Sequence, residues 1–379
     1  MRQTIDAAAF QQMVIHAAAA IRAEKQRIND LNVFPVPDGD TGTNMSLSIG
    51  AAAAEMKKQS FDTVGKAAQA TASALLRGAR GNSGVILSLL FRGFAKAIKE
   101  RETMDGRDLA IALDFGVAAA YKAVMKPAEG TILTVSRLAA ARAAGAARED
   151  NCFEAVLEAA IQEGQLALAD TVNQNPVLKK AGVVDAGGAG FLLILQGMLN
   201  EVRGEEMPAD EEPAQAEKAD FGAIPAEDIT FAFDTVFIVR KPSPNVNLEP
   251  FRTYLNGIGD SLVIGEDDEA FKVHVHTNIP GAALTEAQKY GTLELAKIEN
   301  MRTQADDLAA GKHVQSTDDL DAVEAELESV PAEETPAVAA PEKPYGFLAV
   351  CAGDGLAAVF RDLGCDAVVS GGQTMNPST

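Results

Sequence analysis

Residues 32 to 45 of the chain read Asn-Val-Phe-Pro-Val-Pro-Asp-Gly-Asp-Thr-Gly-Thr-Asn-Met. Two carboxylates, Asp38 and Asp40, flank one glycine, and the prolines before them stiffen the loop because each fixes its own φ. A helix-forming run begins near Thr43, so the carboxylates stand just before a helix N-terminus. Carboxylates hold Mg²⁺, and the free N–H groups of a helix N-terminus bind phosphate. A bare Asp-Gly-Asp is more often a turn with an N-cap, but the whole string predicts a Mg-nucleotide site on a helical fold.

The composition is typical of a multidomain cytoplasmic protein. Its 379 residues suggest two or three domains, and a hydrophobic content of 47% is ample for their cores. The net charge of -21 argues against nucleic acid as a partner and against adhesion to anionic membranes. The three cysteines have no disulfide-framework spacing, and no run approaches the roughly 18 apolar residues of a membrane span. We therefore expect a cytoplasmic protein without a signal peptide or transmembrane segment.

The first half of the chain repeats one helical pattern. Apolar residues recur at helical spacing over residues 6–31. Similar patterns follow at about 43–58, 62–77, 84–99, 107–125, 131–145, 151–170 and 188–203. These segments predict about eight helices and an all-α domain over residues 1–203.

Beyond residue 203 the pattern changes. Residues 204–224 are rich in Glu, Asp, Ala and Pro and are interpreted as an acidic linker. Residues 225–305 predict a small α/β domain, because segments with a period of two alternate with helical ones. The expected strands are 229–239, 261–264 and 270–276, and the expected helices are 248–258 and 281–290.

A second acidic linker, rich in Ala, Pro and Glu, covers residues 306–343. Residues 344–379 then predict a strand, a helix over Gly355–Leu363 and a second strand over Asp366–Ser370. A lone βαβ unit cannot bury its apolar faces. We interpret this segment as the start of a third, truncated α/β domain.

Three further helix starts accompany the aspartate loop, namely Gly78–Gly84, Glu129–Leu133 and Val184–Gly190. Each has a structural explanation when taken alone: a helix–helix turn for the first, and N-caps at Thr131 and Asp185 for the others. In an up-and-down bundle, however, helices two, four, six and eight begin at the same end. The four N-termini would then form a strong anion site.

Together these strings resemble the dihydroxyacetone-kinase L-type phosphotransferases, whose signature is an Asp-Gly-Asp-x-Gly-x-Asn-Met loop with a later Gly-x-Ser-Gly loop. More closely, the whole chain is similar to the ATP-binding A subunit of bacterial fatty acid kinase. The resemblance implies an eight-helix barrel that holds two Mg²⁺ ions and ATP at one end, followed by a middle and a third α/β domain. The strings that carry it are Asn32–Met45, Gly78–Ser88, Val184–Phe191, Lys272–Asn278, Lys297–Gln304 and Gly371–Thr379.

The resemblance also implies roles for single residues. Asp38 and Asp40 match magnesium ligands; the dihydroxyacetone-type loop has a further aspartate where this chain has Val33, and Asn32 is the nearest oxygen ligand. Arg80 is expected to act with the two aspartates in catalysis, a surface salt bridge being the alternative. The expected nucleotide contacts are Thr41, Thr43, Asn44, Gly81, Asn82, Ser83, Gly84, Thr131, Leu133, Asp185 and Gly187.

The implied reaction is phosphoryl transfer from ATP to a fatty acid carboxylate, which gives an acyl phosphate for phospholipid synthesis. A carboxylate is already ionised at neutral pH and needs no general base, and His16, in an apolar helix, is interpreted as structural. The reaction needs repelling anions to be neutralised, which metals and helix N-termini do. In the family a separate DegV-type fatty-acid-binding B subunit presents the acyl chain, and the family suggests a homodimer.

His274 and His276 alternate on an expected strand, so both rings point to one face, a spacing common in metal sites. On spacing alone, a structural role stays open. In the related proteins this pair binds zinc together with a cysteine, at whose position this chain has Asp234. Aspartate is a harder ligand than thiolate. We expect an Asp-His-His zinc site with a position open to solvent or substrate, the alternative being weak or absent zinc.

Two other functions stay open. One is a dihydroxyacetone-type kinase of small polyols, and the other is a non-catalytic nucleotide-sensing scaffold. The acidic linker, the His-x-His domain and the start of a third domain count against the polyol kinase, because that simpler enzyme needs none of them. Acyl-chain preference is expected to lie in the partner.

Overall fold

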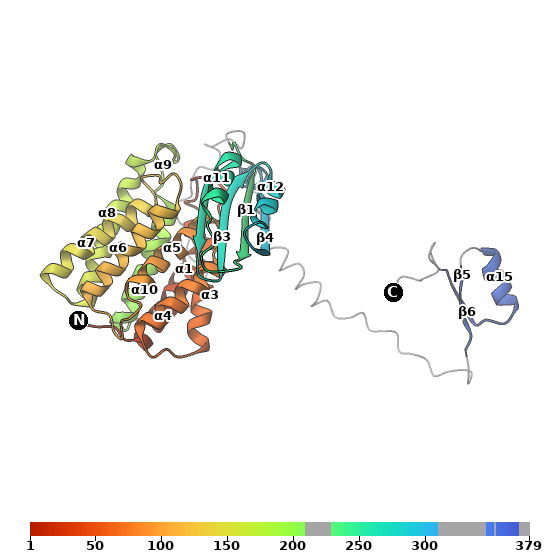
Figure 1. Cartoon of the computed structure of the whole chain (residues 1–379), viewed down its shortest axis with the longest axis horizontal. Helices are drawn as coiled ribbons and strands as arrows, with labels where there is room; N and C mark the ends of the chain where they lie inside the picture. Colours follow the sequence, from red (N-terminus) through yellow and green to blue (C-terminus); the bar gives the residue numbers. More distant parts are fainter. Residues whose placement is uncertain (209–228, 310–345, 352–353, 371–379) are drawn as a thin grey trace. The chain divides into compact units, whose positions relative to one another are not determined.

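The computed structural model describes residues 1–208, 229–309, 346–351 and 354–370 (Figure 1). The chain divides into two compact units, Met1–Thr317 and Asp318–Thr379, which are described separately below. Most of the two predicted linkers, 204–224 and 306–343, and the glycine-rich turn Gly371–Thr379 lie outside the described residues.

The N-terminal part of the first unit is all helical, as the sequence predicts. Two departures concern short elements: the predicted segment 6–31 breaks at Glu24, and a six-residue helix follows α8 after Asn175. The helices are α1 Ala7–Ala23, α2 Lys25–Asn29, α3 Thr41–Lys58, α4 Val64–Gly78, α5 Gly81–Ala97, α6 Gly106–Ala123, α7 Ile132–Glu149, α8 Phe153–Gln174, α9 Pro176–Ala181 and α10 Ala186–Arg203.

Small residues let these helices approach closely. Each long helix packs against the next along the chain, and α10 packs against both α8 and α1. Helices α5 and α6 are in direct backbone contact: a Cβ added at Gly93 would stand 2.2 Å from the carbonyl oxygen of Phe115. Since backbone atoms cannot move aside cheaply, glycine is required there. The abundance of alanine and glycine in this half of the chain thus sets the helix spacing.

The middle part of the first unit is a four-stranded antiparallel sheet with helices on one face. The strand order is β2-β3-β1-β4. Phe237, Phe251 and Phe271 form the centre of a separate core between the sheet and helices α11 and α12. The elements are β1 Phe233–Arg240, α11 Glu249–Ile258, β2 Gly259–Glu266, β3 Ala270–Thr277, α12 Pro280–Ala287, β4 Thr292–Asn300 and α13 Met301–Ala309.

Two details of the predicted sheet are wrong. The first strand begins at Phe233 rather than at residue 229, because Ile229 leads into the sheet as irregular chain. The edge strand β4 is absent from the predicted elements. Its apolar residues Leu295 and Ile298 are 53% and 42% exposed, while Glu299 is buried, so its polarity is the reverse of an ordinary half-buried strand.

The other face of the sheet lies on the helical part. Val263 of β2 is 1% exposed and belongs to the helical core rather than to the core of the sheet. It also forms a β-bridge with Val124, just after α6. Arg77 at the end of α4 forms an ion pair of 2.7 Å with Glu269. Helix α5 also packs against β2 and β3, and Figure 1 shows the sheet beside the helices.

The second unit contains a parallel strand–helix–strand arrangement, as the sequence predicts. Strand β5 (Leu348–Cys351) pairs with β6 (Ala367–Ser370), and α15 (Asp354–Asp362) connects them. Across the described parts of the chain, no helix has the length and apolarity that crossing a bilayer requires.

Gly93→Ala should destabilise the helical part by about 1–3 kcal/mol, because the new methyl group overlaps a carbonyl of α6. Gly50→Ala is the matched control: it also lies within a helix, but its Cβ would have no atom within 4 Å. That substitution should be neutral or stabilising. Urea unfolding followed by far-ultraviolet circular dichroism measures both; equal effects would contradict the packing described here.

Candidate functional site

The aspartate loop places two carboxylates before α3. The Asn32 side chain joins the parts of this loop: its amide nitrogen donates to Asp38, and its oxygen accepts from the Thr41 hydroxyl at 2.5 Å. Asn32 therefore orients Asp38, and it would have to rotate its amide to bind a metal directly. Burial raises the pKa of both Asp38 and Asp40, and the charges of Asp40 and Asp234 raise the pKa of Asp38 further.

The glycine-rich loop joins α4 to α5 beside these carboxylates. Gly81 has a φ of 56°, and a Cβ there would stand 2.3 Å from the amide nitrogen of Asn44. Only glycine fits this left-handed, crowded position. The backbone nitrogen of Arg80 donates to Ser48 on α3 at 3.0 Å. The glycine-rich loop is thus fixed to α3. Helix α5 begins where this loop ends, and the first N–H groups of α5 have no partner within the helix.

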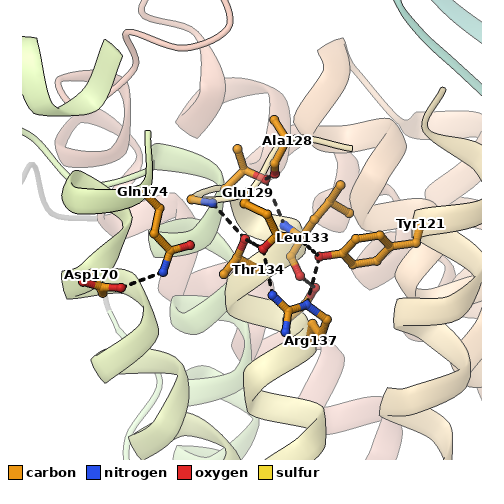
Figure 2. Close-up of polar contacts among 11 residues, drawn as sticks. Tyr121, Ala128, Glu129, Leu133, Thr134, Arg137, Asp170 and Gln174 are labelled. Atoms are coloured by element: carbon orange, nitrogen blue, oxygen red, sulfur yellow. Dashed lines mark hydrogen bonds and ion pairs between the residues drawn. The ribbon is translucent and has the colours of Figure 1, made fainter. Parts of the chain in front are cut away.

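The start of α7 is held by its own polar residues. Thr131 is the N-cap, and its hydroxyl accepts from the Leu133 nitrogen at 3.3 Å. Figure 2 shows the network behind it, in which Glu129 accepts from Thr134 and Arg137, both at 2.7 Å. These bonds hold the pKa of Glu129 below its usual value. These hydrogen bonds tie the segment before α7 to the first turns of that helix.

Asp185 caps α10 from a buried position. Its carboxylate accepts from the Gly188 nitrogen at 2.6 Å, and its own nitrogen donates to the Thr171 hydroxyl at 3.1 Å. Burial raises the pKa of Asp185 to about 7, against the lowering effect of backbone hydrogen bonds from Gly188 and Ile132. The structural role predicted as one alternative is therefore real, and the same residue also faces the site.

One pocket of about 450 Å³ joins these helix starts to the sheet. Of the sequence-predicted site residues, three lie outside its lining: Thr43 pairs with Asn29, Gly84 packs on Ser48, and Arg80 is the N-cap of α5. The predicted residues that line it are Asn32, Asp38, Asp40, Thr41, Asn44, Gly81, Asn82, Ser83, Thr131, Leu133, Asp185, Gly187, Asp234, His274 and His276. The starts of α3, α5, α7 and α10 thus meet at one pocket.

Asp234, His274 and His276 form a compact cluster on the sheet. Their ligand atoms lie within 4.8 Å of one another, with 3.1 Å between the two Nε2 atoms. Two nitrogens on a tetrahedral zinc are about 3.3 Å apart for bonds of about 2.0–2.1 Å. Asp234 Oδ1 and His274 Nδ1 are buried, 3.2 Å apart, and have no hydrogen-bond partner of proper geometry among the described residues. A cation here would take one nitrogen from each ring and one oxygen from Asp234.

Burial disfavours the charged form of both His274 and Asp234, and for His274 the favoured form is the one that binds a metal. Burial first, then the charge of His276, lowers the pKa of His274 well below its usual value, so the ring is neutral as a ligand must be. Burial raises the pKa of Asp234 to about 7, despite the opposing charge of His276. Asp260 lies 3.5 Å from His276 Nδ1 and can orient that ring.

Sequence reasoning missed the charged residues that the sheet adds. Lys297 and Glu299 of β4 form an ion pair of 3.0 Å, and Glu299 lies directly opposite Asp234 in the strand register. The Lys297 charge lowers the pKa of Asp40, against the larger effect of burial. The alternation over Thr292–Asn300 was a usable signal for this strand, but its inward positions are charged.

Comparison with known proteins places the chain in a family. The DAK2 domain family matches residues 35–200, the FakA-like middle domain matches 230–308, and the FakA-like C-terminal domain matches 346–379. The chain belongs to the FakA-like proteins, the family of the A subunit of fatty acid kinase. The FakA-like matches favour a component of fatty acid kinase over a dihydroxyacetone kinase, and the family is one of kinase-type phosphotransferases.

Related sequences support the same assignment. Protein YloV of Bacillus subtilis is 41% identical over 100% of this chain and 67% of its own length. Proteins of Staphylococcus haemolyticus and Staphylococcus saprophyticus are 40% and 39% identical with the same coverage. Among solved structures, a dihydroxyacetone kinase from C. freundii in complex with AMP-PNP and Mg²⁺ matches with 19% identity and a TM-score of 0.41, over 53% of this chain and 35% of that one.

Asp38→Asn should raise the melting temperature of the metal-free protein by a few degrees at about pH 8. A raised pKa means that the folded state binds the proton more tightly, so its stability falls as pH rises above the ordinary value of 3.8. The asparagine amide cannot ionise, so it removes the cost of a charged Asp38. The gain in melting temperature should therefore shrink as pH falls. Thermal scans in a chelator, with exposed Asp170→Asn as control, test this; a lower melting temperature would contradict it.

Proposed function

We propose that this chain is the catalytic component that transfers the terminal phosphoryl group of ATP to a fatty acid carboxylate. The observation that carries the proposal is the meeting of crowded carboxylates with four helix N-termini in one pocket. Helix N-termini bind phosphate through free N–H groups and the helix dipole. Crowded carboxylates require cations, and Mg²⁺ accompanies ATP. The pocket thus offers carboxylates to the Mg²⁺ ion and helix N-termini to the phosphates of a Mg-nucleotide.

The residues present fit divalent cations. Asp38 and Asp40 would hold two Mg²⁺ ions, because both carboxylates are half-buried in the pocket and each has a raised pKa that a cation would lower. Asn32 would keep Asp38 in orientation. The ions, when bound, neutralise the charge of the phosphates and of the transferred group. Gly81, Asn82 and Ser83 supply backbone N–H groups to those phosphates.

The acceptor carboxylate does not need the protein to remove a proton from it. A fatty acid carboxylate, with a pKa of about 4–5, is ionised at neutral pH. The pocket therefore needs positive potential rather than a general base. The charge of Lys297 next to Asp40 is one source of it. Arg80, whose backbone begins the glycine loop, is proposed as another.

The sheet cluster is proposed to hold zinc. His274 and His276 supply two nitrogens and Asp234 one oxygen, which leaves a tetrahedral ion one position for solvent or substrate. Zinc of this kind polarises an oxygen ligand as a Lewis acid. The three residues line the same pocket as Asp38. This shared lining supports the proposal that the open zinc position lies beside the phosphates.

A separate fatty-acid-binding protein of DegV type is proposed to present the acyl group, and the homodimer remains a prediction. Family membership supports the partner, because the middle and C-terminal matches are to FakA-like domains of fatty acid kinase. The formation of a phospholipid precursor in the cytoplasm follows from the same proposal.

Asp40→Ala should lower acyl phosphate formation by at least about a hundredfold while the fold is retained, since the loop lies outside the helical core. Mg-ATP turnover is measured with a lipid-loaded DegV-type partner, without that partner, and with dihydroxyacetone as acceptor. Turnover only with the loaded partner supports the proposal. Dihydroxyacetone phosphorylation would instead support the polyol kinase, and nucleotide binding without any turnover would support the scaffold.

His274→Ala should remove bound zinc, because it deletes one of the two nitrogen ligands. Elemental analysis of the purified chain should find about one zinc per chain, and much less in the variant. His16→Ala is the control: His16 is buried in α1 beside Glu201, away from the cluster, and should leave the zinc content unchanged. Equal zinc contents in the wild type and His274→Ala would refute the site.

A further inference from the structure

A buried lysine of the sheet reaches into the helical part of the unit. Lys272 lies on β3, and the residue is only 3% exposed. Its Nζ atom donates to the carbonyl oxygen of Ala79 and, at 3.2 Å, to that of Arg77. Both carbonyls belong to the end of α4, directly before the Gly81–Ser83 segment that lines the pocket. The lysine therefore touches the base of the glycine loop.

This contact satisfies groups that the helix leaves unpaired. The last carbonyls of an α-helix have no intrahelical donor, and the helix C-terminus attracts a cation. Burial, with the charges of Arg80 and Lys297, lowers the pKa of Lys272 to about 7. A neutral amine still carries two N–H donors. The two hydrogen bonds therefore do not depend on the charge of Lys272.

The glycine loop is held from two sides. On one side the hydroxyl of Ser48 accepts from the Arg80 nitrogen at 3.0 Å and donates to the Asn44 carbonyl at 2.5 Å. On the other side stands Lys272. The Ser48 contact comes from the helical part, and the Lys272 contact, called the brace below, comes from the sheet. Removing Lys272 would leave buried carbonyls without donors, and the loop would shift to regain them.

We propose that Lys272 is a positioning residue of the phosphate site. Through the carbonyls of Arg77 and Ala79, it holds the Gly81–Ser83 backbone where its N–H groups meet the terminal phosphates of a nucleotide. The middle domain is then part of the nucleotide site and not only a carrier of the His274–His276 cluster. This inference rests on the proposed function in one respect, namely that the ligand of the loop is a phosphate.

The test compares Lys272→Met with Lys241→Met. Lys241 is another buried lysine, directly after β1, but its partners at 3.0 Å, the Glu266 carboxylate and the Asp267 carbonyl, lie at the end of β2 and in the turn that follows it, away from the glycine loop. Affinities for Mg-AMP-PNP and for AMP are measured by calorimetry on the full chain. Lys272→Met should weaken AMP-PNP about tenfold, the equivalent of one hydrogen bond, and leave AMP unchanged. Lys241→Met should change neither, and Lys272→Arg should restore most of the loss.

An AMP-PNP affinity in Lys272→Met equal to that of the wild type overturns the proposal. An equal loss of AMP affinity does so too, because it indicates general damage rather than a displaced phosphate loop. If the Met variant does not fold, Lys272→Gln, which keeps a donor on a shorter side chain, is compared by the same two affinities and the same criteria.

Hydrogen exchange separates this inference from the proposed function. In Lys272→Met, the amides of residues 81–83 should exchange faster than in the wild type, whereas in Lys241→Met they should not. If the wild type binds no AMP-PNP, the proposed function fails, and the exchange rates alone decide: faster exchange in Lys272→Met supports the brace, and unchanged exchange refutes it. If AMP-PNP binds and the exchange is unchanged, only the brace is refuted.

Discussion

Repulsion among half-buried, crowded carboxylates is the constraint on which the rest of this structure depends. Asp38 and Asp40 come from a loop before α3, and Asp234 comes from the first strand of the sheet, yet the charge of Asp234 raises the pKa of Asp38. Three acids in one desolvated place are unfavourable unless cations join them. The cluster therefore lowers the stability of the metal-free fold, and a bound cation would restore that stability. The proposed metal-nucleotide chemistry supplies such a cation.

The two parts of the first unit supply different halves of this site. The helical part contributes N-termini, which meet because alternate helices of the bundle start at one end, and the close helix spacing keeps them together. The sheet contributes the face that lies on the helices, where Lys272, His274 and His276 alternate along β3 and Asp234 stands opposite His276. Its opposite face is apolar and packs on its own helices. Val263, buried in the helical core, ties the two parts through one strand.

Local motifs made much of the site predictable. The aspartate loop, the glycine-rich loop and the caps at Thr131 and Asp185 are each encoded within a few residues, so the starts of the helices could be located from periodicity and capping chemistry. The spacing of His274 and His276 likewise placed both rings on one face of a strand. Alternation in a strand fixes the face of each side chain.

Contacts between distant segments were not predictable in this way. Nothing near Lys272 in the sequence indicates that its amine meets the end of α4, because that contact depends on how the sheet docks. Strand β4 was missed for a related reason: Lys297 and Glu299 face inward and Ile298 faces outward, which reverses the usual polarity rule. Such reversals are expected where a site, rather than a core, determines the inward residues.

The most direct measurement is a crystal structure of the chain with Mn²⁺ and AMP-PNP, with the anomalous signal of manganese used to locate the ions. The account predicts manganese within coordination distance of the Asp38 and Asp40 carboxylates, with the terminal phosphates against the Gly81–Ser83 backbone. Manganese and nucleotide bound elsewhere, with both carboxylates free of metal, would contradict it.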